Sequence, residues 1–212
     1  MNHRLLATSA LAVTLALSAA ACTSRGSPSS SSPPAASAPA SRPAASSPAS
    51  GAAAMDFGPA CSAVPKAGAG SFTGMSTAPV ATAASANPVL STLVTAVTKA
   101  GLADTLNSAP AITVFAPDNA AFAKIPSATL AKVLADKAEL TKILTYHVAT
   151  GRYTPAQLAA GTPIKTLEGA TIAPARMGAT YEVNSADVVC GNVQTANATV
   201  YIINTVLMPP SP

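Results

Sequence analysis

Hydrophobic and polar positions divide the chain into three stretches of different character. Residues 5 to about 17 form a mainly apolar run after a polar start. Residues 23–54 are rich in serine, alanine and proline and contain no aromatic or branched aliphatic side chain. From about Met55 onward, apolar residues recur with the periods of helices and strands, so this part is expected to hold the folded core.

The first half of the folded stretch has the period of amphipathic helices. Asn87-Pro88 is typical of a helix start, and apolar residues then recur on one face until Lys99 and Gly101. A short helix at 102–106 and a strand at 112–115 follow, after which Asp118 can cap a helix that carries Phe122 inward. A further helical stretch, with a steady apolar period, is expected over 127–144.

The second half alternates between apolar and polar positions, as strands do. Residues 145–148 have strand character, and Thr154-Pro155 caps a short helix that ends at Gly161. Further strands are expected at 164–167, 171–175, 181–183, 188–190, 193–196 and 199–207. Helices first and strands second predict an α+β fold in which antiparallel sheets supply the core.

The first stretch has the three regions of an export signal, with Arg4 before the apolar run and small residues after it. A membrane-spanning helix needs roughly 20 apolar residues, more than this run provides, so removal of residues 1–21 is expected. The residues before Cys22 resemble a bacterial lipobox, with Ala19 where the usual pattern has leucine. Either Cys22 receives a lipid that anchors the chain to a membrane, or ordinary cleavage after Ala21 leaves a free thiol on a secreted protein.

Residues 22–54 are expected to form a disordered linker. Their composition offers too little apolar surface to offset the entropy lost on ordering the chain. Such a linker can lift a domain away from a membrane. The predicted organisation is therefore a signal peptide over 1–21, a lipidated Ser/Ala/Pro-rich linker over 22–54 and one globular domain over 55–212.

Charge and aromatic content exclude several classes of function. The chain has 12 Lys and Arg against 8 Asp and Glu, and three of the cations, Arg4, Arg25 and Arg42, precede the folded stretch. No basic surface for nucleic acid is therefore expected. With no tryptophan, four tyrosines and four phenylalanines, the rings are too few for a base-stacking platform or an aromatic sugar groove.

Cys61 and Cys190 are the only cysteines after the leader region. In an exported chain two such thiols are most simply joined, and a disulfide between them would connect the start of the domain to its late strands. The alternative, a reactive thiol, lacks a second nearby cysteine and a basic cluster that would lower the pKa of the thiol.

Four segments resemble the signatures of fasciclin (FAS1) domains, in the order and spacing of that family. They are residues 113–122, 144–148, 166–169 and 197–209. Within the family, the chain is most similar to exported single-domain members in mycobacteria, in which a cysteine before the first helix pairs with one in Val-Cys-Gly, as Cys61 and Cys190 would here. The resemblance implies a wedge-shaped β-sandwich flanked by helices, and a role in adhesion or surface interaction without catalysis.

His147 is the only histidine after the leader, so a catalytic triad or a histidine metal site would have to use it. Companion residues with suitable spacing are missing. Two roles remain open. His147 is either a partly buried strand residue that joins two segments through backbone hydrogen bonds, or, with Tyr146, a contact motif like that of animal fasciclin proteins. Lys142-Ile143 replaces the Asp-Ile common in those relatives, which weighs against the contact role.

Other polar residues have simpler explanations. Asp118 and Asn119 fit a helix cap better than a ligand site. Asn197 begins a eukaryotic glycosylation sequon, which is not expected to be used because the lipobox-like leader indicates a bacterial source. Four lysines are expected to solvate outer helix faces or to contact acidic polymers. They are Lys124, Lys132, Lys137 and Lys142.

These observations predict a non-catalytic cell-surface lipoprotein that displays one fasciclin domain, with no cofactor and no metal. Its expected partners are the membrane, through the lipid anchor, and a protein or polymer of a host or of the cell envelope. The alternative is a secreted or envelope carrier of a small apolar ligand, for which a groove between sheet and helices would serve.

Overall fold

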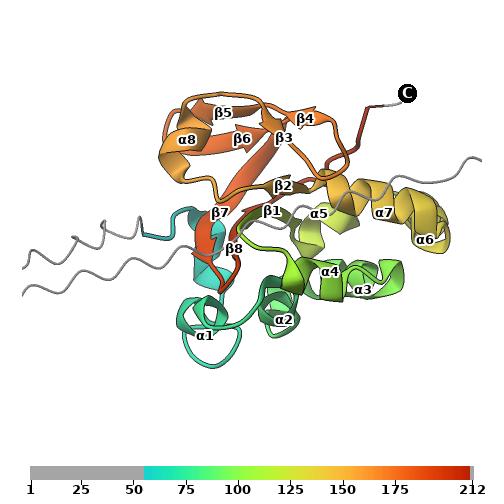
Figure 1. The fold of residues 1–212 in the computed structure, drawn as a ribbon, viewed down its shortest axis with the longest axis horizontal. Helices are drawn as coiled ribbons and strands as arrows, with labels where there is room; N and C mark the ends of the chain where they lie inside the picture. Colours follow the sequence, from blue (N-terminus) through green and yellow to red (C-terminus); the bar gives the residue numbers. More distant parts are fainter. Residues whose placement is uncertain (1–54, 211–212) are drawn as a thin grey trace, which may run out of the picture. The chain divides into compact units, whose positions relative to one another are not determined.

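A six-stranded sheet forms the centre of the computed structural model, which describes residues 55–210 (Figure 1). Its strand order is β2-β1-β8-β7-β6-β5, and β3 and β4 form a separate pair. The strands are β1 (Ile112–Pro117), β2 (Val148–Thr150), β3 (Ile164–Lys165), β4 (Thr171–Ile172), β5 (Pro174–Met177), β6 (Thr180–Val183), β7 (Ala186–Gln194) and β8 (Ala198–Ile203). The export signal, Cys22 and the linker predicted from the sequence lie outside the described residues.

The pairing of β1 with β8 is parallel, whereas the other strand pairs are antiparallel. The expectation of purely antiparallel sheets was therefore wrong for this pair. A parallel pair needs a long crossover, and here the crossover contains most of the domain. Alternation along a single strand carries no information about the direction of its neighbour, so the sequence pattern could not reveal this pairing.

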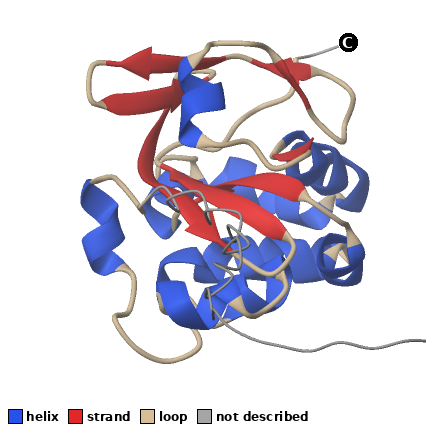
Figure 2. Cartoon of the chain, turned by 60° about the vertical axis from the view of Figure 1, so that its left-hand side comes forward, coloured by secondary structure: helices blue, strands red, loops and turns tan. Residues whose placement is uncertain are grey.

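Strand β7 connects the two parts of the sheet. Its register against β8 shifts between Val188 and Cys190 and again before Val193. Such bulges bend a strand, and Figure 2 shows the long strand curving from the lower sheet into the upper hairpin. Two separate strands were predicted at 188–190 and 193–196, because the bulge interrupts the alternation that marks a strand.

Ten short helices surround the sheet among the described residues. They are η1 (Pro59–Ala63), α1 (Phe72–Ser76), α2 (Val80–Ser85), η2 (Pro88–Leu90), α3 (Ser91–Ala100), α4 (Ala103–Ser108), α5 (Asn119–Ala123), α6 (Ser127–Ala135), α7 (Lys137–Tyr146) and α8 (Pro155–Ala159). Together with the curved sheet they give the α+β sandwich flanked by helices that was expected.

Helix starts follow the capping residues in the sequence. The Asn87 side chain accepts a hydrogen bond from the Val89 amide at 3.0 Å, and Thr154 and Gln157 form a capping box at α8. The break between α6 and α7 was not predicted. Asp136 ends α6 and caps α7 through the Ala138 amide at 2.9 Å, although the apolar period continues across it.

The placement of residues 145–147 in a strand was wrong, although Val148 does lie in one. Helix α7 continues to Tyr146, and the backbone N–H of His147 still donates to the carbonyls of Ile143 and Leu144. Strand β2 begins only at Val148. Apolar side chains of a buried helix end and of a buried strand look alike over four residues, so the pattern could not separate them.

Two hydrophobic cores lie on opposite sides of β1 and β8. The helical core, on the side of α1 to α4, comprises Val64, Met75, Val80, Ala83, Leu90, Leu93, Ala96, Val97, Ala100, Leu106, Ile112, Val114, Ala116, Phe122, Leu140, Leu144, Val148, Cys190, Val193, Ala198, Val200 and Ile202. The sandwich core, on the side of β3 to β6, comprises Phe115, Tyr146, Ala149, Leu158, Ile164, Ile172, Val183, Ala186, Val188, Tyr201, Ile203 and Leu207. Neighbouring strand residues face opposite sides, so Val114 and Phe115 enter different cores, as do Val200 and Tyr201.

The start of the domain is fastened to β7. Cys61 and Cys190 form the predicted disulfide, with 4.9 Å between their Cα atoms. Phe57 pairs with Gly191 through two backbone hydrogen bonds of 3.2 and 2.7 Å. A Cβ atom at residue 191 would lie 2.3 Å from the Phe57 ring, so glycine lets this ring pack directly on the strand. Residues 57–61 are therefore held against the middle of the sheet.

Candidate functional site

The Tyr146-His147 pair lies inside the domain, where each residue is only 2% exposed. The Nδ1 atom of His147 is 2.8 Å from the Ile143 carbonyl oxygen, and its Nε2 atom is 2.9 Å from the Leu207 amide nitrogen. A carbonyl can only accept and an amide can only donate, so Nδ1 carries the proton and Nε2 is the acceptor. His147 thereby joins the end of α7 to the C-terminal segment.

Burial lowers the pKa of His147 from 6.5 to about 4, and the hydrogen bond to the Ile143 carbonyl opposes this shift only in part. The imidazole is therefore neutral at neutral pH. Both ring nitrogens are already hydrogen-bonded to the backbone, so neither is free to bind a metal or to move a proton. This geometry gives His147 a structural role at the end of a helix.

Tyr146 has a comparable role on the other side of α7. Its hydroxyl accepts a hydrogen bond of 2.7 Å from the Asn184 amide group and donates one of 3.3 Å to the Thr171 carbonyl. Burial raises the pKa of the Tyr146 hydroxyl, although the hydrogen bond from Asn184 acts against this. Because Tyr146 and His147 are both buried, a partner at the surface cannot contact this pair directly.

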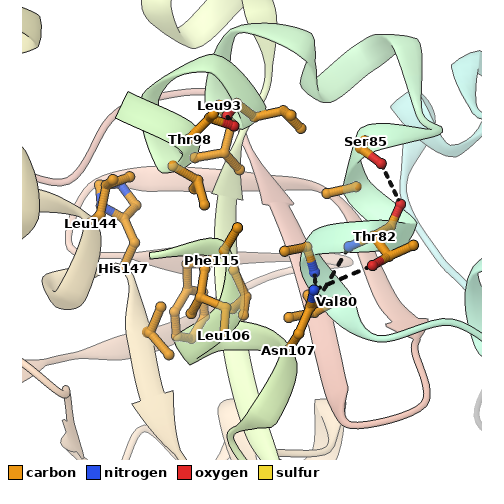
Figure 3. A pocket seen from close by; sticks show the side chains of 17 residues that line it. Val80, Thr82, Ser85, Leu93, Thr98, Leu106, Asn107, Phe115, Leu144 and His147 are labelled. Carbon is orange, nitrogen blue, oxygen red and sulfur yellow. Dashed lines mark hydrogen bonds between the residues drawn. The ribbon is translucent and has the colours of Figure 1, made fainter. Parts of the chain in front are cut away.

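An apolar cavity of about 240 Å³ lies beside His147. Helices α2, α3 and α4, strand β1 and the end of α7 form its walls. Its lining residues are Val80, Ala81, Thr82, Ala84, Ser85, Leu93, Val94, Val97, Thr98, Ala103, Leu106, Asn107, Val114, Phe115, Leu144, His147 and Val148. Figure 3 shows Leu144 and His147 on one side of the cavity, opposite Val80, Thr82 and Asn107.

The few polar side chains around the cavity bond to the protein itself. The Ser85 hydroxyl donates to the Thr82 carbonyl at 2.7 Å, and the Thr98 hydroxyl donates to the Val94 carbonyl at 2.8 Å. The Asn107 amide group donates to the Thr82 hydroxyl at 3.3 Å. None of the lining residues carries a charge at neutral pH. The cavity is therefore suited to apolar rather than ionic occupants.

Two asparagines hold the walls of this cavity together. The side-chain carbonyl oxygen of Asn107 accepts a hydrogen bond of 2.9 Å from the Ala81 backbone amide, which links α4 to α2. The side-chain carbonyl oxygen of Asn197 accepts a hydrogen bond of 2.9 Å from the Val80 backbone amide. The side-chain amide group of Asn197 donates to the Leu106 backbone carbonyl at 2.7 Å. Asn197 thus connects the start of β8 to both helices. Since its amide is bonded inside the protein, the sequon at 197–199 marks a structural residue.

The fasciclin domain model matches residues 88–209. The chain belongs to the fasciclin family. The FAS1 domain pair from the insect cell adhesion molecule fasciclin I has the same fold, with a TM-score of 0.54 and 19% identity over 64% of this chain and 52% of that one.

Two mycobacterial proteins are much more similar in sequence. Immunogenic protein MPT70 of Mycobacterium tuberculosis is 48% identical over 162 residues, which are 73% of this chain and 82% of that protein. Cell surface glycolipoprotein MPT83 of the same organism is 50% identical over 149 residues, which are 68% of this chain and 66% of that protein. The family identified from four sequence segments, and its mycobacterial branch, are thus confirmed.

The remaining polar residues of the fasciclin domain have packing or surface roles. Asp118 caps α5 through the Ala121 amide at 2.6 Å. Asn119 does not cap α5, contrary to the prediction. Its side-chain carbonyl oxygen accepts from the Thr92 amide at 3.0 Å, and its side-chain amide group donates to the Pro88 carbonyl at 2.9 Å. Both contacts join segments far apart in the sequence, so sequence spacing gave no sign of them.

The predicted lysine series is only partly free in solvent. Lys124, Lys132 and Lys137 are exposed, whereas the Lys142 ammonium is 3.9 Å from a Glu168 carboxylate oxygen. Within residues 55–210, no group of three or more histidine, cysteine or acidic side chains is placed to hold a metal ion. In the same range, no helix has the length and apolar character needed to cross a bilayer.

The residues that line the cavity were not recognised in the sequence. Helices α1 and α2 escaped prediction because they are short, and α2 contains mainly alanine, serine and threonine. The one available signal was the concentration of small residues at 80–85, which lets a helix approach a sheet without filling the space between them.

Proposed function

We propose that this chain is an exported, non-catalytic surface protein, anchored by a lipid on Cys22 and displaying its fasciclin domain for adhesion or for contact with a host or envelope component. The observation that carries the proposal is the 50% identity to a protein named cell surface glycolipoprotein. The leader over 1–21, with a cysteine directly after it, supports the same function. A lipid with two or more acyl chains gives stable membrane attachment.

The geometry around His147 supports a function without catalysis. A general base must be able to take a proton from a substrate, and a nucleophile needs such a base beside it. The ring of His147 is buried and both of its nitrogens are hydrogen-bonded to the backbone. The domain accordingly acts by being bound, and the binding surface lies away from the buried Tyr146-His147 pair.

Intact mass spectrometry of the full chain, produced in an actinobacterial host, tests the anchor. The wild-type protein should begin at Cys22, carry added acyl mass and be released from intact cells by a protease. The Cys22→Ala variant is the control, and it should appear in the culture medium with the same folded domain. An unmodified Cys22 on wild-type protein would remove the anchor from the proposal, and failure of the protease to reach the domain would remove surface display.

A second candidate function is the transport or storage of a small apolar ligand. The cavity beside His147 favours it, because a displayed contact domain needs no internal apolar space of this size. Native mass spectrometry of the full chain purified from its own membranes should then detect a bound molecule that organic solvent releases. Purified protein that carries no such molecule would count against a carrier.

A further inference from the structure

We infer that the cavity between α2, α3, α4 and β1 binds a compact, uncharged apolar molecule, of the size of one ring or a short hydrocarbon chain. This inference rests on the second candidate function and gives that function a site and a class of ligand. It depends on four features of the cavity, which are its size, its lining, its rigidity and its opening.

The size of the cavity limits the ligand. Its volume of about 240 Å³ exceeds that of an apolar cavity of about 150 Å³, which is large enough to take up benzene. It is below the range of about 300 to 1,000 Å³ that holds drug-sized ligands. A single ring with a short substituent therefore fits, and a large lipid does not.

The lining selects against charge. An anion or cation entering the cavity would lose its hydration and meet no side chain of opposite charge. The donors of Ser85, Thr98 and His147 already have acceptors within the protein. A ligand rich in hydrogen-bonding groups would find few partners, whereas an apolar ligand loses nothing by this arrangement. Apolar side chains that face the cavity also gain van der Waals contacts when an apolar ligand packs against them.

Hydrogen bonds connect the walls of the cavity to one another. Asn107 joins α4 to α2, and Asn197 joins the start of β8 to both helices. At the deep end, His147 is held by hydrogen bonds to Ile143 and Leu207. A site whose walls are already ordered costs little conformational entropy on binding.

The exposure of the lining residues shows where a ligand enters. Thr82, Ser85 and Thr98 are exposed, whereas Leu144 and His147, with 5% and 2% exposure, lie at the buried end. These exposed residues lie on α2 and α3, which places the entrance at the rim between the two helices. A ligand with one weakly polar end would lie with that end at the rim.

Titration of the full chain with toluene, followed by methyl NMR, tests the site. We expect saturable shifts for the methyl groups of Leu93, Val97 and Leu106, with a Kd on the order of 1 mM. Benzoate has the same ring with a carboxylate, and it should cause no saturable shift at equal concentration. Absence of shifts with toluene, or equal binding of benzoate, would overturn the inference.

Variants that fill the cavity locate the binding. Ala84→Leu and Ala103→Leu add volume at two different walls, so one of them remains informative if the other does not fold. Each should weaken toluene binding by about tenfold or more. Ala131→Leu, at an exposed position of α6, is the matched control and should bind as the wild type does. Unchanged binding by a folded cavity variant would place the ligand elsewhere and overturn the assignment.

These measurements separate the site from the functions proposed for the whole protein. Toluene binding without a co-purified molecule would support the site while counting against a carrier. Failure to bind toluene would overturn the site. It would not affect the acyl mass or the surface display of the chain, because these are measured independently.

Discussion

The two cores of this domain share β1 and β8 but are filled differently. The sandwich core contains Phe115, Tyr146 and Tyr201, with 5.8 Å between the ring centroids of Phe115 and Tyr201. The helical core relies on valine, leucine and alanine, and its alanines lie where α2, α3 and the sheet meet. The cavity beside His147 opens on this helical side.

This difference has a physical cause. Aromatic rings are large and fill the space between closely packed strands. In the helical core, the short side chains of α2 leave space beside this helix that no large side chain fills. The sandwich core thus acts as a rigid support, and the helical core retains space for a ligand. The disulfide fastens the start of the domain to β7 on the helical side, and the hydrogen bonds of His147 join the end of α7 to the C-terminal segment.

Removing the disulfide should have the largest effect, and it tests how far the helical core depends on the sheet. Cys61 and Cys190 are 129 residues apart, and opening a loop of this length costs about 4 to 5 kcal/mol of unfolding free energy. Urea unfolding of Cys61→Ser/Cys190→Ser measures this, with Cys22→Ser in both chains so that no other thiol interferes. A loss below about 1 kcal/mol would show that packing alone holds the first segment.

Truncation at the sandwich core and at the cavity wall tests the comparison. Tyr201 is 0% exposed and its hydroxyl donates to the Tyr153 carbonyl at 2.8 Å, so Tyr201→Ala should cost about 4 kcal/mol of unfolding free energy. Val94 is half-buried at the cavity, so Val94→Ala removes fewer and less buried atoms and should cost only about 1 kcal/mol. Urea unfolding of both variants gives the two values. Equal losses would contradict the looser packing at the cavity wall, because the tyrosine truncation removes many more buried atoms.

Acid should loosen the contact that His147 makes between the cores. The pKa of His147 in the folded protein, about 4, lies below its ordinary value of 6.5. The unfolded chain therefore binds the proton first as pH falls, and stability is full above about pH 6.5 and declines toward pH 4. Between pH 7 and pH 5 the unfolding free energy should fall by about 2 kcal/mol.

The control for this prediction is His147→Gln, measured by urea unfolding at the same two pH values. This variant should be less stable at pH 7, and the part of the pH dependence caused by the histidine should vanish. If the unfolding free energies of the wild type and the variant changed by the same amount between pH 7 and pH 5, His147 would not titrate as its burial implies.

Much of the fold was predictable where the signal is local. Caps at Asn87, Asp118 and Thr154 appear at the expected helix starts, because capping depends on residues within one turn. The pairing of Cys61 with Cys190 followed from their number and the expected compartment. By contrast, the end of α7 at Tyr146 was misassigned, since a buried helix end and a buried strand share one apolar pattern.

The candidate site was harder to predict than the fold. Asn197 was noticed for its sequon, yet its side chain joins β8 to α2 and α4 through contacts with residues about 90 to 117 positions away. No spacing rule covers such distances. The cavity itself is defined by the absence of side-chain volume among five elements, and an absence of volume leaves no periodic mark in the chain.

The sequence by itself determined the family, the disulfide partners and the helix starts at Asn87, Asp118 and Thr154. Those properties depend on residue identity and on neighbours within a few positions. Only the tertiary structure decided the parallel pairing of β1 with β8, the burial of Tyr146 and His147, and the cavity beside them. These depend on how distant segments pack, and packing is a property of the whole domain rather than of any stretch of it.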